Sequence, residues 1–138
     1  MRKRWGLLLA VAALGFGARV GAHHSFAGEF DGNKPVVVTG AVTKVEWRNP
    51  HIWVYLDARN PDGTVTPWQC EGGAPNPMTR KGWNRDTLKL GQELTIQGYQ
   101  AKDGSNTCNA RAFKLPDGRE VFVGTAGDGG PGAPSEPK

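Results

Sequence analysis

Hydrophobic and polar residues alternate along several short stretches of the chain, and each stretch is bounded by glycine, proline or asparagine. Residues 52–59 show the pattern most clearly, because Ile52, Val54 and Leu56 alternate with aromatic and polar side chains. A period of two is typical of a strand that buries one face. The sequence therefore predicts five strands, at residues 36–47, 52–59, 64–73, 92–101 (after a lead-in at residues 88–91) and 109–115, with a hairpin extension over 116–124.

Several residues inside these stretches predict irregular geometry. Gly40 lies within the first stretch, whose alternation is imperfect, so we expect that strand to be strongly curved or bulged. Pro67 lies within the third, which favours an edge position or a bulge. Between the third and fourth strands, Asn76 as N-cap, Pro77 at the first helical position and Gly82 as the stop predict one or two turns of helix.

Three strands, a short helix and two further strands indicate an all-β fold, an OB-like five-stranded Greek-key barrel. An immunoglobulin-like sandwich is the main alternative, but its seven strands would crowd a chain of this length. In the OB arrangement the third and fifth strands pair, which would bring Cys70 close to Cys108. Their separation excludes a CxxC motif, and we expect one disulfide, with two buried free thiols as the alternative.

The first residues of the chain have the pattern of an export signal. A basic head at residues 2–4 precedes an apolar stretch over residues 5–16, and the small residues of Val20-Gly21-Ala22 fit a signal-peptidase site. An uncleaved membrane anchor is the alternative, but an anchor needs about 20 apolar residues. We therefore expect a signal peptide at residues 1–22, a domain at 23–124 and a disordered, Gly/Pro-rich tail at 125–138, in a periplasmic or secreted protein that contacts the membrane only during export.

Removal of the signal changes the charge of the chain. Four of its 17 basic residues fall within residues 1–22, which leaves 13 basic against 13 acidic residues and a formal net charge of zero. Nucleic-acid binding needs a basic surface to neutralise phosphates. The balanced charge therefore argues against a nucleic-acid partner.

Several motifs resemble those of a family of small exported bacterial proteins, domain of unknown function 6152. They are AHHSFAGEFD, VTKVEWRNPHIWVYLD, EGGAPN, RKGWNRDTLKLGQELTIQGYQAKDGSN and ARAFKLPDGREVF, from about Ala22 to Phe122. The resemblance implies a small exported β domain, and it supplies neither an activity nor catalytic residues. It also implies that Cys70 and Cys108 stand where the family usually has other residues, so that a disulfide would be separate from the shared function.

The three histidines form a candidate metal site. Cleavage after Ala22 would leave His23 with a free α-amine, and this amine and the ring nitrogen could close one chelate ring on a metal. His24 follows directly, and a nitrogen from His51 would complete an arrangement similar to the histidine brace of exported copper proteins and oxidative polysaccharide-cleaving enzymes. Such nitrogen ligands suit Cu(II), Ni(II) or Zn(II), with copper binding most tightly. The alternative is that these histidines are ordinary exposed residues.

A second candidate site is an aromatic surface around the predicted turn at residues 48–51. It comprises Trp47, Asn49, Trp53, Tyr55, Glu71 and Trp83. Exposed aromatic side chains would hold a small ligand, a peptide or an envelope protein without a metal. The alternative is that Phe26 and Phe30 cover this face as a second small core.

The sequence offers little support for an enzyme. Hydrolase and phosphate-binding motifs are absent from it. A binding module that holds copper or another transition metal is the leading interpretation, a metal-free interaction domain the alternative, and a copper-dependent oxidoreductase the third hypothesis.

Overall fold

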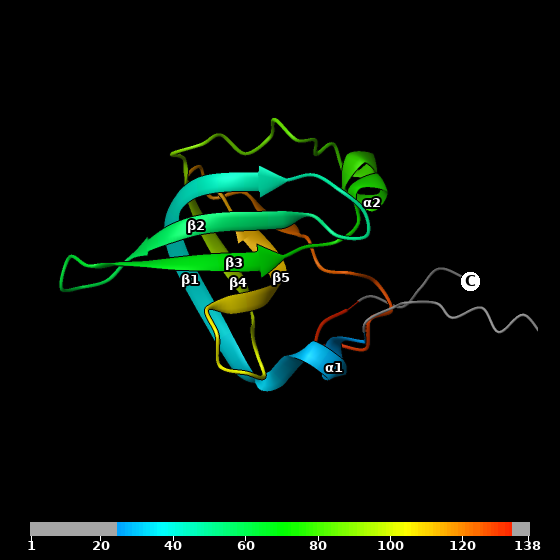
Figure 1. Ribbon diagram of the computed structural model, residues 1–138. Helices are drawn as coiled ribbons and strands as arrows, with labels where there is room; N and C mark the ends of the chain where they lie inside the picture. The colour runs from blue at the N-terminus through cyan, green and yellow to red at the C-terminus, as the bar shows by residue number, and fades with distance from the viewer. Residues whose placement is uncertain (1–24, 134–138) are drawn as a thin grey trace, which may run out of the picture.

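The computed structural model describes residues 25–133 as an all-β fold with two short helices (Figure 1). His23, His24 and the expected signal peptide lie outside the described residues. The elements in chain order are α1 (Phe26–Glu29), β1 (Phe30–Glu46), β2 (Trp53–Arg59), β3 (Val65–Glu71), α2 (Pro75–Arg80), β4 (Glu93–Ala101), β5 (Thr107–Lys114) and β6 (Glu120–Phe122).

The strands form a closed ring, in agreement with the predicted OB-like order. Antiparallel pairing gives the order β3-β2-β1-β4-β5-β6, and a parallel pairing between β3 and β5 closes the ring. The long strand β1 curves over the ring and pairs with β2 on one side and β4 on the other (Figure 1). Gly40 lies within this curved strand, where it pairs with Ala58 on β2 and with Leu94 on β4. The predicted irregularity is also present, as a shift in register between Val42 and Lys44.

The inward faces of the strands make the main core. Ile52, Val54 and Leu56 are almost completely buried, as the alternation along residues 52–59 predicts. Phe113 on β5 is fully buried, and the ring of Trp83 packs against it at a centroid distance of 5.9 Å. The segment that follows α2 therefore contributes to the core instead of remaining on the surface.

The predicted disulfide between Cys70 and Cys108 is confirmed. The two residues are direct partners in the β3–β5 register, with their Cα atoms 4.5 Å apart, and both side chains are fully buried. The short helix is also confirmed, but its predicted start is wrong by two residues. Ala74 is the N-cap and Pro75 the first helical residue, so that two prolines with fixed φ, and not an Asn76 cap, define the first turn.

Residues 125–133, the first part of the expected tail, pack against the domain. Asp128 is bound by the buried Arg111 side chain of β5 through contacts of 3.0–3.2 Å, and its carbonyl accepts a hydrogen bond from Phe26 N at 3.2 Å. Figure 1 shows this segment beside α1. A Gly/Pro-rich composition favours disorder where the chain has no binding partner. Here Arg111 binds Asp128 and holds the segment against the domain. Residues 134–138 of the expected tail lie outside the described residues.

The N-terminal helix makes a second, smaller core. Phe26 and Phe30 pack with Tyr99 and Ala101 of β4, and the ring of Phe26 meets Tyr99 edge to face at 5.6 Å. The guanidinium of Arg111 lies 4.8 Å from the centre of the Phe26 ring. None of the helices within residues 25–133 is long and apolar enough to cross a membrane.

Candidate functional site

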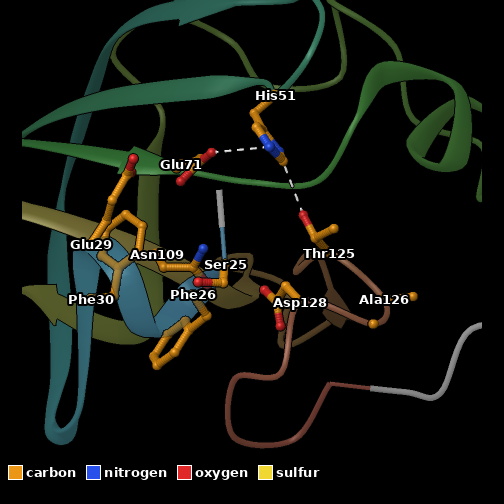
Figure 2. Close-up of a pocket in the computed structure, with 11 residues that line it drawn as sticks. Ser25, Phe26, Glu29, Phe30, His51, Glu71, Asn109, Thr125, Ala126 and Asp128 are labelled. Atoms are coloured by element: carbon orange, nitrogen blue, oxygen red, sulfur yellow. Dashed lines mark hydrogen bonds and ion pairs between the residues drawn. The ribbon is translucent and has the colours of Figure 1, made fainter. Parts of the chain in front are cut away.

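A pocket of about 220 Å³ lies at the end of the ring where α1, β3, β5 and the C-terminal segment meet (Figure 2). Ser25 and α1 form one wall, and residues 125–128 form another. His51 from the turn after β1, Glu71 from the end of β3 and Asn109 from β5 complete the lining. These residues are far apart in sequence, and the closure of β3 against β5 brings them together.

Backbone hydrogen bonds hold the turn that carries His51 against the end of β3. Ile52 N donates to the Gly73 carbonyl at 3.0 Å, and Gly72 N donates to the Ile52 carbonyl at 2.8 Å. A Cβ atom at Gly72 would lie 2.8 Å from the Ile52 side chain, so the close approach requires glycine. The imidazole of His51 is then placed with Nδ1 at 3.1 Å from the Gly72 carbonyl oxygen.

The second nitrogen of His51 faces Glu71. Nε2 lies 3.3 Å from Oε1, and the side chains of His51 and Glu71 are 21% and 10% exposed. Because a carbonyl oxygen only accepts hydrogen bonds, the contact with Gly72 places a proton on Nδ1 and directs Nε2 at the carboxylate (Figure 2). This pairing of a histidine with a carboxylate is the main polar feature of the pocket.

Asn109 contributes a buried amide to the same pocket. It is 5% exposed, and among the described residues no donor lies within hydrogen-bond distance of its Oδ1 atom. It pairs directly with Glu71 in the β3–β5 register, one residue beyond the disulfide. A buried polar atom without a partner is uncommon in proteins and calls for a structural explanation.

The C-terminal segment supplies the outer wall. Thr125 Oγ1 lies 3.5 Å from Nδ1 of His51, and Asp128 is anchored by Arg111, as described above. The side chains of Arg111 and Asp128 are 9% and 7% exposed. Their charges compensate each other, so the ion pair fixes the wall without adding net charge to the pocket.

The structure places the predicted metal-site residues in two groups. His51 lies in the pocket, whereas His23 and His24 precede the described residues. Within residues 25–133 no three histidine, cysteine, aspartate or glutamate residues form a cluster that could hold a metal ion. Ser25 lines the pocket, however, and it follows His24 directly in the sequence.

The predicted aromatic surface is only partly assembled. Trp83 is 8% exposed and belongs to the main core, which corrects its assignment to a surface, because its ring is needed to cover Phe113. Trp47 is half-buried and packs against the same core, and Asn49 is exposed. Glu71 instead faces His51 in the pocket. Nothing in the alternation of residues predicted the pairing of Glu71 with His51, because it depends on a contact across 20 positions.

Trp53 and Tyr55 do share the outer face of β2, as predicted, and both are half-buried. Trp53 lines a hollow of about 430 Å³ beside α1, and Tyr55 lines one of about 280 Å³ beside β3. Burial raises the pKa of the Tyr55 hydroxyl, and the negative charge of Glu46, to which this hydroxyl donates a hydrogen bond at 3.2 Å, raises it further. Phe26 and Phe30, which the alternative interpretation places over this face, pack with Tyr99. Phe30 also lines the hollow beside Trp53.

Comparison with protein families identifies the chain. Residues 10–110 match the model of DUF6152, a family of unknown function. The chain belongs to this family. No curated protein matches it closely enough to count as a relative. Membership of DUF6152 thus agrees with the resemblance found in the sequence motifs, and any function must be argued from the pocket itself.

Proposed function

We propose that this DUF6152 protein is exported and that its mature form binds a transition-metal ion, copper first, between His51 and the N-terminal His23 and His24. The observation that carries the proposal is the position of Ser25 in the wall of the pocket that contains His51. His24 and His23 precede Ser25 directly in the sequence, and consecutive Cα atoms are about 3.8 Å apart, so the chain between these histidines and the pocket is short. The chain connection therefore supports a shared site.

The orientation of His51 also supports this function. Histidines that bind metals usually donate the hydrogen of their other ring nitrogen to a carbonyl or carboxylate, which fixes the ring and the tautomer. The contact between Nδ1 and the Gly72 carbonyl at 3.1 Å is of this kind. It leaves Nε2 as the coordinating nitrogen.

A buried disulfide is consistent with an oxidising compartment such as the periplasm. The Cys70–Cys108 bond is present, and the described residues contain no free cysteine. Together with the signal-like residues 1–22, it supports export and the removal of the signal before His23.

The first test is mass spectrometry of the protein recovered from the periplasm, which should give a chain that begins at His23. Cu(II) titration of that chain should show one tight site, which weakens at least tenfold in His51→Ala. A form with one extra glycine before His23 keeps all three histidines but removes the amine chelate, and it should weaken the site similarly. An exposed substitution on the opposite side, Glu93→Gln, is the control. Binding that is no tighter than millimolar, or unchanged in both altered forms, would refute the proposal.

The outer face of β2 supports a second candidate function, that of a metal-free interaction domain. The two hollows beside Trp53 and Tyr55 adjoin, because both are lined by Gln69 and Thr107. A small ligand or an envelope protein bound there would contact Trp53. NMR would favour this candidate if addition of periplasmic extract changed the chemical shifts of Trp53 and Tyr55 alone and addition of copper changed none.

A further inference from the structure

We propose that Glu71 is a direct ligand of the metal ion and that Asn109 accepts a hydrogen bond from its coordination shell. With this set of donors the site holds the oxidised ion, Cu(II), in preference to Cu(I). The inference rests on the proposed function, and it adds two residues and an oxidation state that the histidines alone do not specify.

The first argument is the contact between His51 and Glu71. Nδ1 of His51 donates to the Gly72 carbonyl, so a neutral ring presents the lone pair of Nε2 to a carboxylate oxygen 3.3 Å away. Two acceptors at this distance repel unless a cation lies between them. A metal ion bound to both atoms would remove this repulsion.

The same distance is close to that of two ligands of one metal ion. Imidazole nitrogen and carboxylate oxygen bind divalent ions at about 2.0–2.2 Å, so two neighbouring ligands are about 2.8–3.1 Å apart in the tetragonal geometry that Cu(II) favours. A shift of a few tenths of an ångström in the two side chains would therefore admit the ion between Nε2 and Glu71 without movement of the backbone. The backbone itself is fixed here by the pairing of Ile52 with Gly72 and Gly73.

The second argument is the buried amide of Asn109. Its Oδ1 atom has no donor among the described residues, although the residue is 5% exposed and lines the pocket. Glu71 and Asn109 are register partners, so the orphan amide lies beside the carboxylate that would bind the ion. A metal-bound water would supply the missing hydrogen and remove the cost of an unsatisfied buried acceptor.

The third argument is the chemistry of the donors. Cu(I) favours soft sulfur ligands, whereas a carboxylate and amine or imidazole nitrogens favour divalent ions. The sequence contains only two cysteines, which form the disulfide, and two methionines. Met1 falls within the expected signal, and Met78 is buried in the main core. No soft ligand is thus available to the mature site, while Glu71 adds a negative charge that favours Cu(II).

The test compares both oxidation states on the mature protein that begins at His23. Competition with chelators of known affinity should give tighter binding of Cu(II) than of Cu(I). Glu71→Gln keeps the shape of the side chain but removes its charge, and it should weaken Cu(II) binding ten- to a hundredfold while Cu(I) binding changes less than threefold. Asn109→Ala should weaken Cu(II) binding about tenfold. Glu120→Gln, an exposed carboxylate on β6, is the matched control and should change neither affinity.

The outcomes separate this inference from the function on which it rests. If the wild-type protein binds neither ion, the proposed function fails. If Cu(II) binds through His51 but Glu71→Gln binds it equally well, the function stands and the role of Glu71 is refuted. Tighter binding of Cu(I) than of Cu(II) by the wild-type protein refutes the preference for the oxidised ion and needs no variant. Electron paramagnetic resonance of bound Cu(II) should change in Glu71→Gln, and melting curves show whether each variant is folded.

Discussion

Replacement of Asp128 by asparagine tests whether the C-terminal segment is part of the fold. The Asp128 carboxylate makes three contacts of 3.0–3.2 Å with the Arg111 guanidinium, and both side chains are less than 10% exposed. Removal of one partner from a buried ion pair leaves an uncompensated charge and costs about 3–5 kcal/mol. Asparagine keeps one acceptor oxygen for Gly130 N or Arg111. We therefore expect a loss of unfolding free energy at the lower end of this range, about 3 kcal/mol.

The assay is urea unfolding followed by tryptophan fluorescence. With a slope of about 1.5 kcal/mol per molar urea, a loss of 3 kcal/mol lowers the midpoint by about 2 M. Asp117→Asn is the matched control, because Asp117 pairs with Arg119 at 2.7 Å but these side chains are 52% and 76% exposed. An exposed pair contributes less than about 1 kcal/mol. Equal effects of Asp128→Asn and Asp117→Asn would refute the argument that residues 125–133 are anchored by a buried charge.

Three further predictions concern the ring itself, and each is measured as the free energy of unfolding in urea. Replacement of Cys70 and Cys108 by serine removes a cross-link over 38 positions and should cost about 4 kcal/mol, whereas a loss below 1 kcal/mol would contradict the calculation from loop entropy. Gly40→Ala should cost about 1–3 kcal/mol, because the new Cβ would overlap the Asp57 carbonyl; an unchanged midpoint would mean that β1 and β2 can separate freely. Phe113→Ala should cost about 3–5 kcal/mol as a cavity opens beneath Trp83, and a smaller loss would show that the core collapses to fill it.

The strands could be predicted because the signals for them are local. The alternation along residues 52–59 needs no knowledge of distant partners, and the structure has a strand there, β2. Boundaries were less accurate where a distant partner decides them. β1 begins at Phe30, several residues before the predicted start, because Phe30 pairs with Ala101 of β4. A polar stretch with a glycine and a proline gives no local sign of such pairing.

The residues of the pocket were harder to predict as a site. His51 and Glu71 were both candidates, but in different roles, since one was assigned to a metal and the other to an aromatic surface. Asn109 was not a candidate at all. A lone asparagine in a strand carries no chemical signal until its burial and its missing partner are known. Asp128 could not be predicted as a wall of the pocket for a similar reason. The composition around it is typical of disorder, and its partner Arg111 lies far away in the sequence, in β5.

The position of the disulfide links the fold to the pocket. Cys70 and Cys108 pair β3 with β5, and the next residue along each strand, Glu71 and Asn109, lines the pocket. The family resemblance implied a disulfide separate from the shared function, yet a cross-link one residue away restricts the two side chains on which the proposed Cu(II) preference depends. Both cysteines are fully buried, so the bond acts on the site through the backbone register and not through direct contact. A chain without it would have to hold Glu71 opposite Asn109 by the parallel pairing of β3 and β5 alone, which spans only three residue pairs.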